Sequence, residues 1–276
     1  MKKIDIYVFS ATGNTYKCAE ELKKNVVTLG AEAEIKRIEN GSEKVENVGD
    51  TIVVCYPVHG FNAPTNVIAF CKGLPASNVD AYVLKTSGEP LTINDNSSKE
   101  VVKAFKTKGY GYKGEYHYVM PYTMIFRHTD EMAAKMYRTA KERIPKAAET
   151  IMQGETHCKK ISAKAKLVRK VVSIEHWGAK VNGRFFHVKE DKCLHCMKCV
   201  KNCPTKNISY VDGKFKFGGN CLLCTRCSFN CPTDAFRIGI MDFMRVNGKY
   251  DFSADPEQAK IGKYCKKAYE RYFAEE

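Results

Sequence analysis

The sequence holds 276 residues, 44% of them hydrophobic, and carries a formal net charge of +14. This length accommodates one large and one small domain. No apolar run approaches the ~20 residues that a membrane-spanning helix needs. The opening Met-Lys-Lys leads directly into a strand-like segment without a signal-peptide pattern. Composition therefore predicts a cytoplasmic protein without a membrane span.

The first 155 residues alternate between strand-like and helix-like segments. Helical spacing is clearest for Cys18, Leu22, Val26 and Leu29, in a helix that ends at Gly30. Strands that alternate with helices favour a parallel sheet covered on both faces, so we expect an α/β, doubly wound domain over residues 1–155. Strands are predicted at 3–9, 33–39, 51–58, 81–88 and 115–120, and further helices at 64–71, 97–107 and 130–153, the last kinked at Pro145.

Three loops of this domain are expected to form one binding site. In doubly wound sheets, ligands bind outside the carboxyl ends of the strands, where the strand order reverses. The loops that leave the first, third and fourth strands are residues 10–15, 57–63 and 86–90.

The first loop, "SATGNT", is built for an anion. Ser10, Thr12, Asn14 and Thr15 offer side-chain hydrogen bonds, Gly13 permits close backbone approach, and a helix N-terminus follows. The loop contains no Lys or Arg and matches neither the G-x-x-x-x-G-K-[ST] nor the G-x-G-x-x-G pattern. It therefore predicts a phosphate held by neutral donors.

The second half of the chain is basic at first and then rich in cysteine. Lys and Arg outnumber Asp and Glu by 24 to 13 in residues 151–276, against 21 to 18 in residues 1–150. Residues 156–182 are expected to be a basic connecting segment with a helix at 163–177. A two-fold repeat at 193–238 predicts pseudo-symmetry in a small domain at 183–245. A C-terminal tail, 246–276, is expected to be helical at 256–274.

Eight of the thirteen cysteines lie in this repeat, as "CLHCMKCVKNCP" and "CLLCTRCSFNCP". Both copies match the C-x2-C-x2-C-x3-C-P pattern of bacterial ferredoxins, in which the fourth cysteine of each run binds the other cluster of the pair. We therefore expect one 4Fe-4S cluster on Cys193, Cys196, Cys199 and Cys231, and another on Cys221, Cys224, Cys227 and Cys203.

A zinc site is the alternative for these cysteines, since zinc also uses C-x2-C pairs. Zinc would leave the third cysteine and the Cys-Pro of each run without a role. The cysteines outside the repeat are expected to be packing residues; they are Cys18, Cys55, Cys71, Cys158 and Cys265.

With "SATGNT", "YPVHGFNAP" and "KTSGEP" after its first, third and fourth strands, the first domain resembles the flavodoxins. Together with the cysteine repeat, the whole chain resembles a flavodoxin-ferredoxin fusion family of anaerobic bacteria and archaea. The resemblance implies a five-stranded parallel sheet in the order 2-1-3-4-5, FMN as cofactor, and a small α+β two-cluster domain. It places FMN on Ser10, Thr12, Gly13, Asn14, Thr15, Pro57, His59, Gly60, Phe61, Asn62, Thr86, Ser87 and Gly88. The alternative is a flavodoxin-like domain that binds no flavin.

The loops depart from the flavodoxin pattern in one respect. Many flavodoxins place an aromatic ring on each face of the flavin, but the third loop has no aromatic residue before Tyr110. One flavin face is therefore expected to be open to a substrate, a partner's cofactor or this protein's own nearest cluster. His59 is expected near the flavin, where it would bond the ring or move a proton; an equal alternative is a loop histidine paired with backbone.

Three redox centres in one chain predict a relay that couples one-electron clusters to a two-electron flavin. The alternative is a reductase that acts on a small organic substrate at the flavin. The basic residues between 156 and 189 predict an acidic ferredoxin or an acceptor reductase as partner. Nucleic acid is disfavoured because no nucleic-acid-binding motif is visible. The sequence does not fix the oligomeric state.

Overall fold

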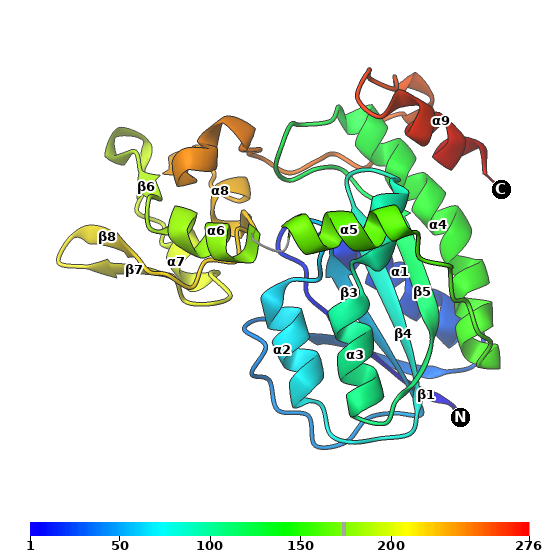
Figure 1. The fold of residues 1–276 in the computed structure, drawn as a ribbon. Coiled ribbons are helices and arrows are strands. Elements are labelled where there is room, and N and C mark those ends of the chain that lie inside the picture. Colours follow the sequence, from blue (N-terminus) through cyan, green and yellow to red (C-terminus); the bar gives the residue numbers. More distant parts are fainter. Residues whose placement is uncertain (173–174, 276) are drawn as a thin grey trace.

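The computed structural model describes residues 1–172 and 175–275, and the side chains of residues 172–177 lie outside this description. A five-stranded parallel sheet forms the centre of the first domain (Figure 1). The order is β2-β1-β3-β4-β5, which confirms the predicted flavodoxin-like order and puts the reversal point between β1 and β3. The strands are β1 Lys3–Val8, β2 Glu32–Arg37, β3 Thr51–Pro57, β4 Asp80–Ser87 and β5 Gly111–Val119.

Helices cover both faces of this sheet. On one face, α1 (Asn14–Thr28) and α4 (Asp130–Gln153) bury Leu22 and Ile144 against the strands. On the other, α2 (Thr65–Gly73) and α3 (Lys99–Thr107) bury Phe70 and Phe105. Full burial of such side chains stabilises the fold by ~1.5–3 kcal/mol each. The helix α4 continues through Pro145. No helix in the described ranges is both long and apolar enough to cross a bilayer.

Three of the cysteines outside the repeat pack in these cores as expected. Cys18, Cys55 and Cys71 are buried, and burial raises the pKa of each thiol. Cys265 is half-buried. Cys158 is exposed, so the packing prediction was wrong there. Its position follows from the turn at His157, whose backbone pairs with the edge strand β5 at Gly114 and Glu115 and leaves Cys158 outside.

The basic segment forms two helices, α5 (Ala163–Val172) and α6 (Glu175–Gly183), where one was predicted at 163–177. Residues 173–174 of that prediction lie outside the described residues. Arg169 of α5 is tied to α3, because its Nη2 lies 2.9 Å from Oε1 of Glu100. At least one of the basic residues therefore serves packing between segments.

The cysteine-rich region is a small α+β unit beside the first domain (Figure 1). Its apolar core, centred on Phe186, Ile208, Phe236 and Ile238, packs against cysteines of both repeats. Two short antiparallel sheets flank it: β6 (His187–Val188) with β9 (Phe236–Arg237), and β7 (Ile208–Val211) with β8 (Lys214–Phe217). The short helices are α7 (Lys198–Lys201), α8 (Arg226–Phe229), η2 (Glu190–Lys192) and η3 (Gly239–Met244).

The backbone of this unit repeats with the sequence. Helix α8 follows α7 by the same 28 positions that separate Cys221 from Cys193. Three residues with positive φ in the first repeat have counterparts in the second at that spacing, which confirms the predicted pseudo-symmetry. The pairs are His195 with Leu223, Met197 with Thr225, and Lys206 with Asp234.

The C-terminal tail is less helical than predicted. Helix is confined to η4 (Pro256–Gln258), a single 3-10 turn, and α9 (Lys266–Ala274), so the expectation of one helix at 256–274 was wrong. The intervening chain is irregular, with a turn before α9, and its Ile261 packs against a core cluster of β5, α4 and α9. Helix α9 also docks there, since the backbone N–H of Val119 donates to Tyr272 Oη at 3.1 Å.

Lys85 and Glu115 form a buried ion pair between β4 and β5. Lys85 Nζ lies 2.5 Å from Glu115 Oε1, and its side chain is fully buried. The same ammonium donates to the carbonyl oxygens of Asn94 and Asp95 at 3.0 and 3.3 Å. The pair therefore ties the sheet to the chain segment that follows β4.

Replacing Lys85 with Ala would leave the Glu115 carboxylate buried without its cation. We expect the free energy of unfolding, measured by denaturant titration, to fall by ~3–5 kcal/mol. Arg138→Ala, which breaks an exposed pair with Glu257, is the control and should cost about 1 kcal/mol or less. A loss in Lys85→Ala no larger than in the control would contradict this account.

Candidate functional site

The loops at the carboxyl edge of the sheet enclose a cavity of about 360 Å³, here called the main cavity. This volume lies in the range of small-molecule sites, about 300–1,000 Å³. Most of the predicted binding residues line it: Ser10, Thr12, Asn14, Thr15, Pro57, His59, Gly60, Phe61, Thr86, Ser87 and Gly88. Gly13 and Asn62 do not line it. The structure thus brings the three predicted loops together.

The phosphate loop leaves its backbone donors available. The N–H groups of residues 12–15 make no hydrogen bond to any described residue. Gly13 caps α1 with φ 105°, where a side chain would be strained, and no acidic side chain stands in the first turn. An anion at this helix N-terminus would satisfy these donors and the helix dipole.

The side chains of this loop, which the sequence predicted as anion donors, already make hydrogen bonds within the protein. Asn14 Nδ2 donates to the carbonyl oxygen of Pro121 at 2.8 Å, and the hydroxyls of Thr15 and Thr86 lie 2.7 Å apart. Ser10 Oγ accepts from the backbone N–H of Tyr16 at 3.2 Å. These side chains shape the loop, so the backbone supplies the principal anion donors.

The loop after β3 makes a tight turn at the edge of the main cavity. His59 and Asn62 exchange two backbone hydrogen bonds of 2.9 Å, with Gly60 and Phe61 at positive φ between them. The His59 ring lies 6.3 Å from the ring of Phe9, in an edge-on arrangement. Asn62 is buried and holds the turn, which explains why it does not line the cavity.

Glu89, Asn94 and Tyr122 form a polar wall of the main cavity. Glu89 lies in the predicted loop 86–90, whereas the sequence analysis missed Asn94 and Tyr122. The Tyr122 hydroxyl donates to Glu89 Oε2, and Asn94 Nδ2 donates to Glu89 Oε1 at 3.2 Å. Burial raises the pKa of Glu89, while these two donors act in the opposite direction. The signal for Tyr122 was its place directly after the fifth strand, at the same edge as the other loops.

Tyr122 explains two neighbouring features. A Cβ on Gly88 would lie 2.3 Å from the Tyr122 ring, so only glycine fits at position 88. Tyr269 of α9 donates its hydroxyl proton to the carbonyl oxygen of Gly88 and lies 3.3 Å from His128 Nε2, while His128 stacks on Tyr122. The C-terminal helix therefore supports the loop after β4.

The remaining wall comes from the cysteine-rich unit. Leu222, Leu223, Cys224 and Thr225 line the main cavity, together with Met241 and Met244. The second cysteine repeat of the same chain thus closes part of the main cavity. The sequence analysis named this protein's own nearest cluster as one of three possible neighbours of an open flavin face.

The eight repeat cysteines fall into two groups. Cys203, Cys221, Cys224 and Cys227 line one cavity, the inner cysteine cavity. Cys193, Cys196, Cys199 and Cys231 line another, the outer cysteine cavity, whose wall also includes Cys227. Cys203 and Cys231 each lie with the three cysteines of the opposite repeat. The grouping matches the crossed sets expected from the sequence.

Backbone N–H groups approach the sulfur atoms in a repeated pattern. His195 and Leu223 donate to Cys193 and Cys221 at 3.4 and 3.3 Å. Asn207 and Ala235 donate to Cys203 and Cys231, both at 3.2 Å. Such donors stabilise negative charge on sulfur, as cluster thiolates need.

Burial opposes ionisation of the Cys199 and Cys221 thiols. It raises the pKa of Cys199 to about 11 and that of Cys221 to about 12. Near neutral pH these two thiols therefore stay protonated in the metal-free chain, and binding of a metal would displace their protons.

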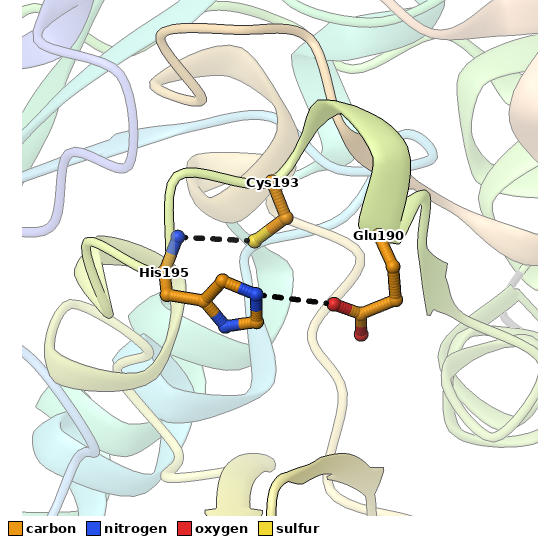
Figure 2. A group of neighbouring side chains, drawn as sticks. All are labelled: Glu190, Cys193 and His195. Atoms are coloured by element: carbon orange, nitrogen blue, oxygen red, sulfur yellow. Dashed lines mark hydrogen bonds and ion pairs between the residues drawn. The ribbon is translucent and has the colours of Figure 1, made fainter.

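Figure 2 shows the surroundings of Cys193, where His195 Nε2 lies 3.3 Å from a carboxylate oxygen of Glu190. Glu190, Cys193 and His195 bring their donor atoms within 4.8 Å of one another. The sequence analysis had not singled out Glu190 or His195. Their exposed positions place a polar, partly charged neighbour beside the outer cysteine cavity.

Comparisons with known proteins agree with this geometry. A 4Fe-4S binding domain model matches residues 185–208. The chain joins a flavodoxin-like domain to a 4Fe-4S binding region. These two parts make it an iron–sulfur redox protein with a flavodoxin-like fold.

Solved structures resemble about half of the chain. A short-chain flavodoxin associated with a non-canonical PDU bacterial microcompartment shares 16% identity, over 55% of this chain and 96% of its own, with a TM-score of 0.40. The Streptococcus pneumonia TIGR4 flavodoxin shares 18% identity, over 55% of this chain and 97% of its own, with a TM-score of 0.37. An NAD(P)H:quinone oxidoreductase from Methanothermobacter marburgensis shares 12% identity, over 56% of this chain and 97% of its own, with a TM-score of 0.38. No curated protein sequence matches.

His117 of β5 contacts Ser87, a residue that lines the main cavity. Its Nε2 lies 2.7 Å from Ser87 Oγ, and burial lowers its pKa to about 3. Because this pKa is below that of an unfolded histidine, about 6.5, the unfolded state binds more protons at low pH. His117 therefore contributes stability above about pH 6.5 that is lost as the pH falls toward 3.

The variant His117→Gln should show a weaker pH dependence of unfolding. Between pH 6.5 and 5, we expect the free energy of unfolding of this variant to fall by about 1 kcal/mol less per pH unit than that of the wild type. Denaturant titrations across this range measure the difference. His187→Gln, at an exposed position, should follow the wild type. Parallel curves for all three proteins would refute this role of His117.

Proposed function

We propose that this protein is an electron-transfer flavoprotein that relays electrons between FMN in the main cavity and two 4Fe-4S clusters in the cysteine cavities. One observation carries the proposal. Leu222, Cys224 and Thr225 line both the main cavity and the inner cysteine cavity, and Cys227 lines both cysteine cavities. The three sites are therefore consecutive, with a shared wall at each step.

The residues of the main cavity fit FMN. The unpaired N–H groups of residues 12–15 would hold the phosphate, and the turn at His59 and Phe61 would hold one side of the ring system. Tyr122 and Glu89 supply the polar wall, and the buried Oδ1 of Asn94 has no hydrogen-bond partner in the described chain. FMN, when bound, exchanges electrons singly or as a pair, whereas a 4Fe-4S cluster carries one.

The cysteine groups fit two clusters. We assign Cys203, Cys221, Cys224 and Cys227 to an inner cluster, and Cys193, Cys196, Cys199 and Cys231 to an outer one. The N–H donors at each sulfur and the apolar core around the cysteines suit iron–sulfur ligation. Glu190 and His195 then stand beside Cys193 without replacing a thiolate.

We further propose an acidic redox protein as partner, docking at the outer cluster. Cys196 and Leu194 are exposed, with the exposed cations Lys192, Lys198 and Lys201 in the same stretch of chain. Two clusters and an FMN phosphate would lower the formal charge from +14 to roughly +8, so a cationic surface remains. The roof over the main cavity favours this relay over a reductase that admits a substrate to the flavin.

Cofactor content tests the proposal directly. Anaerobically purified protein should contain about eight irons and one FMN per chain. Cys203→Ala and Cys231→Ala are a matched pair, and each should reduce the iron content to about four. Because the inner cavity adjoins the main cavity, only Cys203→Ala should also change the absorption of bound FMN. Full iron content in both variants, or zinc in place of iron, would be incompatible with the assignment.

Charge reversal tests the partner. With an acidic ferredoxin as electron donor, Lys198→Glu combined with Lys201→Glu should slow reduction of the chain at least several-fold at low salt and less at high salt. Lys164→Glu combined with Lys166→Glu, on α5, makes the same charge change in the basic stretch 156–189, to which the sequence assigned the partner. It is the comparison, and stronger slowing by this variant would place docking on that stretch instead. Equal slowing by both double variants, or none by either, would rule out docking at the outer cluster.

A further inference from the structure

Arg226 lies between two cysteines of the second repeat, yet its side chain contacts the first domain. The guanidinium donates from Nε to the carbonyl oxygen of Ala11 at 3.2 Å and from Nη2 to that of Ser10 at 3.0 Å. Its Nη1 pairs with the carboxylate of Glu39 and donates to the carbonyl oxygen of Asn202 at 3.1 Å. The side chain is only 11% exposed. Arg226 thus holds the phosphate loop in place by hydrogen bonds to its backbone oxygens.

The hydrogen bonds from Arg226 orient two backbone N–H donors of the phosphate loop. In a planar trans peptide unit the C=O and N–H bonds point in opposite directions. Holding the carbonyl oxygens of Ser10 and Ala11 therefore aims the N–H groups of Ala11 and Thr12 away from Arg226. Neither N–H has a partner among the residues that the structure describes. Arg226 leaves both donors free for an anion on the opposite side of the loop.

The loop that carries Arg226 also completes the main cavity. Thr225 Oγ1 donates to the carbonyl oxygen of Thr123 at 3.1 Å, and residues 222–225 line the cavity. Leu223 and Thr225 have φ values of 51° and 56°, a left-handed conformation that residues with a Cβ adopt only when their surroundings hold them. The surroundings on one side are the cysteines, since the N–H of Leu223 donates to Cys221 Sγ at 3.3 Å.

One short loop therefore takes part in two sites. Its sulfur atoms line the inner cysteine cavity, while its side chains roof the main cavity and hold the phosphate loop. A ligand that orders this loop from one side favours the conformation needed on the other, and such coupling is reciprocal. Resting on the proposed function, we infer that Arg226 is a positioning residue that makes tight FMN binding depend on a loaded inner cluster.

The first repeat provides an internal control. The position equivalent to Arg226 is Lys198, which is exposed and whose ammonium makes no hydrogen bond or ion pair within the described ranges. The two repeats have the same cysteine spacing, but at this position the second has an arginine that contacts the first domain and the first has an exposed lysine. Arg can hold two acceptors with one planar fork, whereas Lys presents a single point charge. The coupling is thus built into the second repeat alone.

The test measures FMN affinity by quenching of flavin fluorescence in the full chain, either cluster-free or reconstituted anaerobically with ferrous iron and sulfide. We expect cluster loading to tighten FMN binding about tenfold or more in the wild type and in Lys198→Gln, and by less than about twofold in Arg226→Gln. By reciprocity, FMN should slow the loss of iron to a chelator in the wild type but not in Arg226→Gln. Arg226→Lys should fall between the two.

The results that would overturn the coupling differ from the result that would overturn the proposed function. Equal FMN affinity with and without clusters in the wild type would overturn the coupling while leaving the proposed cofactors in place. Equal weakening of both states by Arg226→Gln would make Arg226 a merely structural contact and would also overturn it. Absence of FMN binding in every state would instead overturn the proposed function. If Arg226→Gln does not fold, the wild-type comparison and Arg226→Lys still decide.

Discussion

The structure depends on one constraint: the loop from Cys221 to Cys227 must satisfy two domains at once. Its cysteines belong to the iron–sulfur region, and its other side chains close the cavity of the flavodoxin-like domain. Both demands fall on seven consecutive residues, two of which adopt left-handed backbone conformations. The position of the small domain is therefore fixed by contacts that also define the binding sites.

Other contacts reinforce this arrangement. Arg127 donates to three backbone oxygens at 247–249, and the N–H of Ile125 donates to the carbonyl oxygen of Met244 at 2.7 Å. Helix α9 returns to the first domain and supports the loop after β4 through Tyr269. The two parts thus share the lining of adjacent cavities, and separating them would remove one wall of the main cavity.

Local and periodic features were predictable from the sequence. The alternation of strands and helices indicated the parallel sheet, and the cysteine spacing indicated crossed groups of four, because both follow from short-range patterns. Contacts between distant segments were not predictable in this way. Leu222, Thr225 and Arg226 reach the first domain only through the docking of two units, and nothing in their local sequence signals it.

Two further misses have similar physical causes. Tyr122 belongs to the loop after β5, which enters the site because strand ends meet at one edge, although the loop carries no binding motif. The segment around Ile261 was predicted to be helical but is irregular, because packing on the first domain outweighs weak local propensity. Sequence patterns reached the site residues on loops with a recognisable motif or strand-end position and missed those on segments without one.

The most direct test of the shared-loop arrangement is an anomalous diffraction measurement at the iron absorption edge on anaerobic crystals containing FMN. The account predicts two separate iron peaks, one bounded by Cys203, Cys221, Cys224 and Cys227, with FMN density in contact with residues 222–225. Iron at a single site, or FMN bound away from this loop, would contradict it.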